Sequence, residues 1–201
     1  MSKEKKKYIY DPITVFDSLY KGLLSEGDRA TVILAVAKID LILFQILQKF
    51  LVSVSGSKDE LLDNDKPLST LSAKINMTYR LGLINNSFSH SLHLIRKIRN
   101  DFAHEVEGCT LNSGAHRDRV RELIAPAKNL KDFDKICDII KKGDKFALAS
   151  VQFRAMIVLV CLDLENLFED CNALSEKDAL NLSMHQKNLK KYPKLKIYNV
   201  I

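Results

Sequence analysis

The sequence has little in it that would interrupt a helix. Among 201 residues there are 7 glycines, 4 prolines and no tryptophan, while leucine, isoleucine, lysine and aspartate are abundant. Because glycine and proline end helices and form tight turns, their scarcity argues against a turn-rich fold. The composition therefore predicts an all-α protein, and a hydrophobic content of 46% is enough for a sizeable core.

Paired cysteines are also missing. No C-x-x-C pair and no secretory signal occur in the sequence, and His90 and His93 have no second pair of ligands near them. Zinc sites need closely spaced cysteines and histidines, and disulfide frameworks are typical of secreted chains. We therefore expect free buried thiols in a cytoplasmic protein, with no metal site and no cofactor. The 4 cysteines are Cys109, Cys137, Cys161 and Cys171.

Several common functional signatures are absent. There is no glycine-rich phosphate loop and no nucleophile elbow, which argues against a P-loop NTPase and against serine or cysteine hydrolases. The net charge of +6 comes partly from lysines near the two ends, so the totals show no strongly basic face for duplex DNA. Lys38 and Asp40 interrupt the longest apolar run, so we expect no membrane span.

Two long apolar segments, 28–54 and 144–171, have helical periodicity. They predict a multi-helix bundle with two long central helices, and Asp28 is a candidate N-cap of the first. A helix pair within residues 61–104 should complete a four-helix core. We expect one domain over residues 13–191, between a charged, frayed segment 1–12 and a tail 192–201. Shorter helices are predicted at 13–24, 116–123, 132–142 and 175–191.

Residues 61–104 contain the densest polar chemistry. Ser69 and Ser72 are candidate N-caps of a first helix that stops near Gly82. Asn85 or Asn86 can cap a second helix, which ends in the sequence RNDFAH. Its last third is basic and includes Arg96.

A loop at residues 55–66 carries an acidic patch. Its carboxylates lack the glycine and the closing glutamate of a calcium loop, so they are better explained as caps or as partners for the basic helix. Together with Arg96 they form the predicted protein-partner surface. The acidic residues are Asp59, Glu60, Asp63 and Asp65.

Asp40 lies in an apolar setting where an unpaired carboxylate is costly. Two interpretations stay open. Asp40 is either solvated or paired across to a neighbouring helix, or it faces Arg99 and His104 inside the bundle.

The pattern LLDxDxPLxxLS, followed by a tyrosine, LGLIN and RxxxxH, resembles the mannitol operon repressor (MltR-like) family. The resemblance covers about forty-five residues and implies an all-α regulatory protein of the cytoplasm with a protein partner. The residues that carry it are Leu61, Leu62, Asp63, Asp65, Pro67, Leu68, Leu71, Ser72, Tyr79, Leu81, Gly82, Leu83, Ile84, Asn85, Arg99 and His104.

RNDFAH also resembles the Arg-polar-x-x-x-His signature of HEPN domains, many of which are metal-independent ribonucleases that act as dimers. That resemblance implies a homodimeric state, and it implies that His104 is the acid or base, that Arg99 holds the scissile phosphate and that Asn100 positions one of them. The structural alternative pairs Arg99 with Asp63 or Asp65 and lets His104 cap the helix.

Three functions stay open on these grounds. The first is a regulator that acts through protein contacts; the second is a ribonuclease or RNA-binding protein; the third is an antitoxin or immunity protein whose acidic loop meets a basic target. Residues 71–80 superficially resemble the start of a helix-turn-helix, but Gly82 and Asn85 interrupt the recognition helix that should follow. No sequence-specific DNA binding is therefore expected.

Overall fold

The computed structural model describes residues 22–23, 25–54, 56, 58–105, 108–128, 130–141 and 146–175. The predicted segment 1–12, the predicted tail 192–201, most of the predicted helix 13–24 and nearly all of 175–191 lie outside these residues, as does part of the loop 55–66.

The prediction of an all-α fold is confirmed. The described residues contain six α-helices, a short 3-10 helix and no strand. The elements are α2 (Asp28–Phe50), α3 (Leu71–Arg80), α4 (Asn86–His104), α5 (Gly114–Ile124), η1 (Ala125–Ala127), α6 (Lys131–Lys141) and α7 (Leu148–Asp170).

Both long helices are shorter than predicted. α2 ends at Phe50, because Leu51 turns to an extended conformation with φ −68° and ψ 154°. α7 begins at Leu148, after Ala147 in an extended conformation. The apolar pattern continues past Phe50, but β-branched and polar residues such as Val52 and Ser53 do not favour a helix there.

The helix caps correct two predictions. Thr70 caps α3 by accepting a hydrogen bond from the Ala73 N–H, so the choice of Ser69 or Ser72 is wrong. Asp28 does not cap α2, since Gly27 is the N-cap and the Asp28 side chain has other partners. The predicted cap Asn85 is confirmed, because its side chain accepts from the Phe88 N–H.

α2 and α7 pack along each other in the most extensive contact between any two described helices. Buried residues of α2 recur every three or four positions and so form one face, including Val32, Ile39 and Ile46. In α7, by contrast, residues 153–158 are all buried. A helix buried on all sides needs neighbours on several sides, and α5 and α6 cover the sides of α7 that α2 leaves open.

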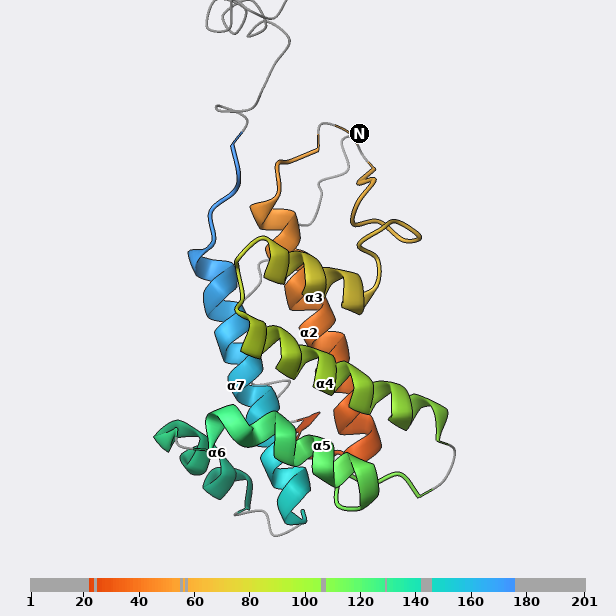
Figure 1. The fold of residues 1–201 in the computed structure, drawn as a ribbon, viewed down its shortest axis with the longest axis vertical. Helices are drawn as coiled ribbons and strands as arrows, with labels where there is room; N and C mark the ends of the chain where they lie inside the picture. The colour runs from red at the N-terminus through yellow and green to blue at the C-terminus, as the bar shows by residue number, and fades with distance from the viewer. Residues whose placement is uncertain are drawn as a thin grey trace, which may run out of the picture.

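The four-helix core differs from the predicted one. α2 packs on α7 and α4, and α5 packs on the same two helices, so α2, α4, α5 and α7 close a ring (Figure 1). α5, expected to be a minor element, buries Val120, Leu123 and Ile124. α3 instead lies against α2 and α4 outside the ring, and α6 lies against α7.

α2 is long and apolar enough to cross a membrane by length and composition. In its most apolar 18-residue window, 56% of the residues are buried inside the protein. A core helix has the same composition, and α2 contacts three other described helices.

Candidate functional site

The RNDFAH sequence forms the last turn and a half of α4. The helix continues through His104, so Arg99 and His104 are five positions apart in a regular helix. At 100° per residue their side chains leave the axis about 140° apart. They would share a face only if the helix stopped near Phe102, and it does not. Arg99 and Asn100 are half-buried and His104 is exposed.

Arg99 lines a groove between α2, α3 and α4. Among the described residues it has no hydrogen bond and no ion pair, and the expected pairing with Asp63 or Asp65 is not formed. The donors of this guanidinium are therefore not used by any described residue. The groove is lined by Ile33, Val36, Ala37, Asp40, Ser69, Thr70, Leu71, Arg99 and Ala103.

Asp40 lies in the same groove and pairs with a neighbouring helix, as one of the two interpretations predicted. Its carboxylate lies 2.9 Å from the Lys74 Nζ of α3. Lys74 is buried and also donates to the Ser69 carbonyl at 3.2 Å. The pair neutralises both charges, which leaves Arg99 as the unpaired cation of this groove among the described residues.

The acidic loop is organised largely by its own carboxylates. Asp59 accepts hydrogen bonds from the N–H groups of Leu61 and Leu62, and Asp63 accepts one from the Asp59 N–H at 2.9 Å. Glu60 pairs with Lys66. The expectation that these residues act as local caps is confirmed for Asp59 and Asp63.

The remaining partner-surface residues, Asp65 and Arg96, differ in exposure. Asp65 is exposed and has a left-handed φ of 64°. Arg96 is half-buried, and its Nε is buried without a hydrogen-bond partner among the described residues. The assignment of the whole set to partner binding stays a prediction.

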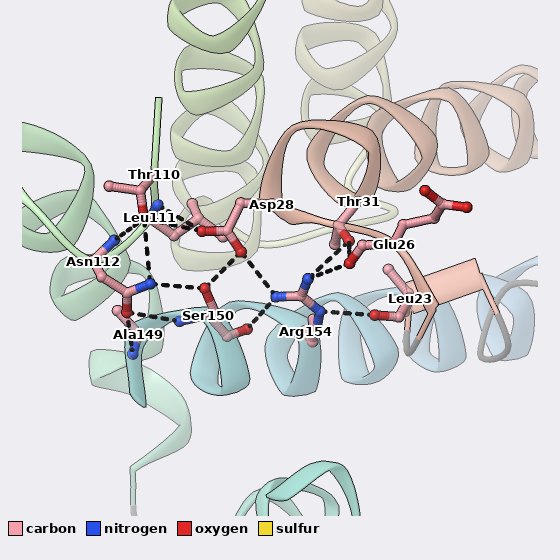
Figure 2. Close-up of polar contacts among 10 residues, drawn as sticks. All are labelled: Leu23, Glu26, Asp28, Thr31, Thr110, Leu111, Asn112, Ala149, Ser150 and Arg154. Carbon is pink, nitrogen blue, oxygen red and sulfur yellow. Dashed lines mark hydrogen bonds and ion pairs between the residues drawn. The ribbon is translucent and has the colours of Figure 1, made fainter. Parts of the chain in front are cut away.

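A buried ion pair joins the N-terminal ends of α2 and α7 (Figure 2). Asp28 Oδ1 accepts hydrogen bonds from the Ser150 hydroxyl at 2.6 Å and from Arg154 at 3.1 Å. Its Oδ2 accepts from the Leu111 N–H at 2.9 Å and from the Thr110 hydroxyl at 3.2 Å. One carboxylate thereby connects α2, α7 and the loop before α5.

Arg154 is 0% exposed, and all its nitrogens donate. The acceptors besides Asp28 are the carbonyls of Leu23, Glu26 and Ser150 and the Thr31 hydroxyl (Figure 2). The guanidinium also lies 3.8 Å from the centre of the Phe146 ring. Because all donors of Arg154 are used within the protein, this side chain stabilises the fold and has no donor left for a ligand.

Burial and hydrogen bonding act in opposite directions on this pair. Burial raises the pKa of Asp28, but the Ser150 and Leu111 hydrogen bonds and Arg154 outweigh it, so the pKa lies below its usual 3.8. Burial lowers the pKa of Arg154, and Asp28 works against that shift.

A third cluster lies where α4 ends and α5 begins. Cys109 Sγ is 3.6 Å from His116 Nε2, and the same nitrogen is 3.3 Å from Glu105 Oε1. Burial, with Glu105 beside it, raises the pKa of the Cys109 thiol to about 11. The hydrogen bond from Cys109, followed by that from His116, lowers the pKa of Glu105.

Comparison with known proteins adds one similar structure. The chain matches no model of a known protein family and no curated protein. It is similar to a chain in the X-ray structure of the MtlR-HPr complex from Escherichia coli, with a TM-score of 0.49 and 20% identity over 78% of this chain and 97% of that one. Similarity at this level does not establish a shared function.

The Asp28–Arg154 pair and the Glu105–Cys109–His116 cluster were both missed by sequence reasoning. In the sequence Arg154 stands out only as a break in an apolar run, although a charge in the middle of such a run is a signal of a buried pair. Cys109 and His116 are seven residues apart, a spacing that no common zinc motif contains.

Proposed function

We propose that this protein is a regulator of the MltR-like kind, which acts by binding another protein and not through a DNA-binding motif of its own. The observation that carries the proposal is Arg99, a half-buried cation that has no partner among the described residues and lies in a largely apolar groove. Protein interfaces are enriched in arginine at their centres, where a partner supplies the missing acceptors.

The groove is continuous with an exposed apolar stripe on α2. Ile33, Leu34 and Leu41 are 40%, 46% and 48% exposed, and Ile33 also lines the groove. The exposed Ala37 lies between them on the same side of the helix. An apolar stripe beside an unpaired arginine has the composition of a contact surface. We name this surface, formed by Ile33, Leu34, Ala37, Leu41 and Arg99, the α2–α4 face.

The acidic loop is the second part of the proposed contact. It is followed, after Pro67 and Leu68, by Ser69 and Thr70 at the edge of the groove. Glu60 and Asp65 remain exposed there after Asp59 and Asp63 have formed the turn. Exposed charges of this kind set orientation and association rate more than affinity. A homodimer is proposed on the resemblance of RNDFAH to the HEPN signature, because HEPN enzymes act as dimers.

The test compares two cations of α4. E. coli HPr, the partner in the similar structure, is the first protein to titrate, by calorimetry. We expect Arg99→Ala to weaken association by about 30-fold, as for a hot spot of about 2 kcal/mol, and Lys97→Ala to change it less than about twofold. Lys97 is exposed and on the same helix, so it is a matched control. Equal effects of the two substitutions would contradict the assignment of the α2–α4 face.

The ribonuclease alternative is favoured by one observation: His104 is exposed and Arg99 is not paired among the described residues, although the two side chains do not share a face of α4. Because Arg99 has no carboxylate partner to lose among these residues, we expect Arg99→Ala and His104→Ala to change the free energy of unfolding by no more than about 0.5 kcal/mol. We expect total RNA to stay intact with the wild type in the absence of metal. If the wild type cleaves RNA and His104→Ala loses this activity at an unchanged melting temperature, the regulator proposal is wrong and the ribonuclease alternative is supported.

A further inference from the structure

We propose that Glu105, Cys109 and His116 bind one divalent transition-metal ion, and that Zn²⁺ is the ion they fit best. The three side chains come from the C-terminal end of α4, the following loop and the first turn of α5. Each offers one ligand atom of a type that zinc accepts: a carboxylate oxygen, a thiolate sulfur and an imidazole nitrogen. This site is independent of the proposed function.

Two of the three distances between the ligand atoms agree with a tetrahedral ion. With Zn–S near 2.3 Å and Zn–N and Zn–O near 2.05 Å, a tetrahedral centre puts sulfur and nitrogen about 3.6 Å apart and nitrogen and oxygen about 3.3 Å apart. The structure has 3.6 Å between Cys109 Sγ and His116 Nε2, and 3.3 Å between that nitrogen and Glu105 Oε1. All three ligand atoms lie within 4.8 Å of one another.

The surroundings of the other ring nitrogen of His116, Nδ1, support the metal site independently of the ligand distances. Nδ1 is buried, has no hydrogen-bond partner among the described residues and lies 3.9 Å from Asp101 Oδ2. Histidines that bind a metal through one nitrogen commonly direct the other at a carboxylate, which fixes the tautomer. Arg119 holds Asp101, and the Phe102 ring lies 4.9 Å from the imidazole, so the ring is fixed before any ion arrives.

The site is open on one side. Glu105 is exposed, and Cys109 lines a groove shared with Arg29 and Ile33, so an ion can enter from solvent. With three protein ligands the fourth position is left for water or for a group on another molecule. The cations facing the cluster are Arg29, which donates to the Glu105 carbonyl, and Arg119; the carboxylates of Glu105 and Asp101 offset them.

The ligand set distinguishes between metals. A thiolate and an imidazole favour Zn²⁺ and its neighbours in the first transition series, whereas Mg²⁺ and Ca²⁺ take mainly oxygen ligands. We therefore expect Zn²⁺ and Co²⁺ to bind the same site and Mg²⁺ at equal concentration not to compete.

The first experiment titrates Co²⁺ into the full chain after chelator treatment, and then displaces it with Zn²⁺. A tetrahedral thiolate site gives a sulfur-to-cobalt charge-transfer band in the near ultraviolet, which Zn²⁺ should abolish. Cys109→Ser should remove this band, and His116→Gln should weaken Zn²⁺ binding by about 100-fold or more. Asp101→Asn should weaken it by about 10- to 100-fold. The controls are Cys137→Ser on α6 and His90→Gln, an exposed histidine paired with Glu122.

A second measurement needs no variant. Bound Zn²⁺ should protect Cys109 of the wild type from alkylation, read as the modified fraction of its peptide by mass spectrometry. Absence of protection at saturating Zn²⁺, or a charge-transfer band that persists in Cys109→Ser, would overturn the proposal. If Cys137→Ser also loses the charge-transfer band, the thiolate ligand is not specifically Cys109, and this outcome too would contradict the proposal.

Discussion

Among single residues, the strongest constraint is the Asp28–Arg154 pair. Both groups are removed from most solvent, and the side chains are 14% and 0% exposed. Such a pair contributes little more to the stability of the folded protein than two apolar residues would in its place. Removal of one partner, however, leaves an uncompensated charge in the core. Its importance is therefore best measured by changing one partner.

We predict that Asp28→Asn lowers the free energy of unfolding by about 3 kcal/mol at pH 7, because Arg154 loses its counter-charge. The pKa of Asp28 is lowered in the folded protein. Its stabilisation is thus complete above the unfolded pKa near 3.8 and is lost as the pH falls through the folded pKa. In urea titrations, the loss of stability below about pH 4 should be shallower in Asp28→Asn than in the wild type.

Asp118→Asn is the matched control. Asp118 pairs with Arg121 on the surface of α5, and its side chain is 65% exposed. Surface pairs contribute at most about 1 kcal/mol. If Asp28→Asn is as stable as the wild type at pH 7, the Asp28–Arg154 network does not stabilise the fold.

Among the elements, the turn between α3 and α4 is set by a left-handed glycine. Gly82 has φ +74°, its N–H donates to the Tyr79 carbonyl, and the Leu83 N–H donates to the Thr78 carbonyl. These are the two hydrogen bonds of a Schellman motif, and they satisfy carbonyls that the end of α3 leaves free. The sequence prediction of a stop at Gly82 is confirmed by this geometry.

Substitutions at Gly82 should report backbone strain alone, because a Cβ there would meet nothing within 4 Å. We predict that Gly82→Ala lowers the free energy of unfolding by about 1 kcal/mol, and that Gly82→Asn costs less, since asparagine tolerates left-handed backbone better than alanine. Chemical denaturation of both variants measures the difference. Equal losses would indicate that packing, and not φ, determines the choice of glycine.

At the scale of the whole molecule, the packing of α2, α4, α5 and α7 into a ring determines which helix surfaces remain exposed for binding. A helix does follow α3 closely: α4 begins at Asn86, where the sequence predicted a second helix. However, α4 buries seven residues against its neighbours and is 19 residues long. A helix fixed in a bundle core in this way presents only its outer side, and no described element stands free as a recognition helix.

We therefore predict no sequence-specific binding of duplex DNA by the purified protein. Any binding should be electrostatic, from the net charge of +6, and should weaken steeply as salt increases. A mobility-shift assay with operator and scrambled duplexes at low and physiological salt checks this. A shift confined to the operator and resistant to salt would overturn the prediction.

The class of fold, the positions of the described helices and several of their ends could be predicted from the sequence. These features depend on contacts within a few residues: the apolar period of α2, the side-chain cap at Asn85 and the glycine at the end of α3. The charged loop was also visible, including the local role of Asp59 and Asp63 as caps. Local rules predict such features because the interacting groups are neighbours in the chain.

Which helices close the ring, and which side chains meet, became evident only in the folded protein. Asp28 and Arg154 are 126 residues apart, and no periodicity relates them. Glu105, Cys109 and His116 are close in sequence, yet they converge only because α5 folds back against α4. Asp63, one of the two expected partners of Arg99, is instead used within its own loop. Pairings of this kind depend on how whole helices pack, which propensities and spacing do not encode.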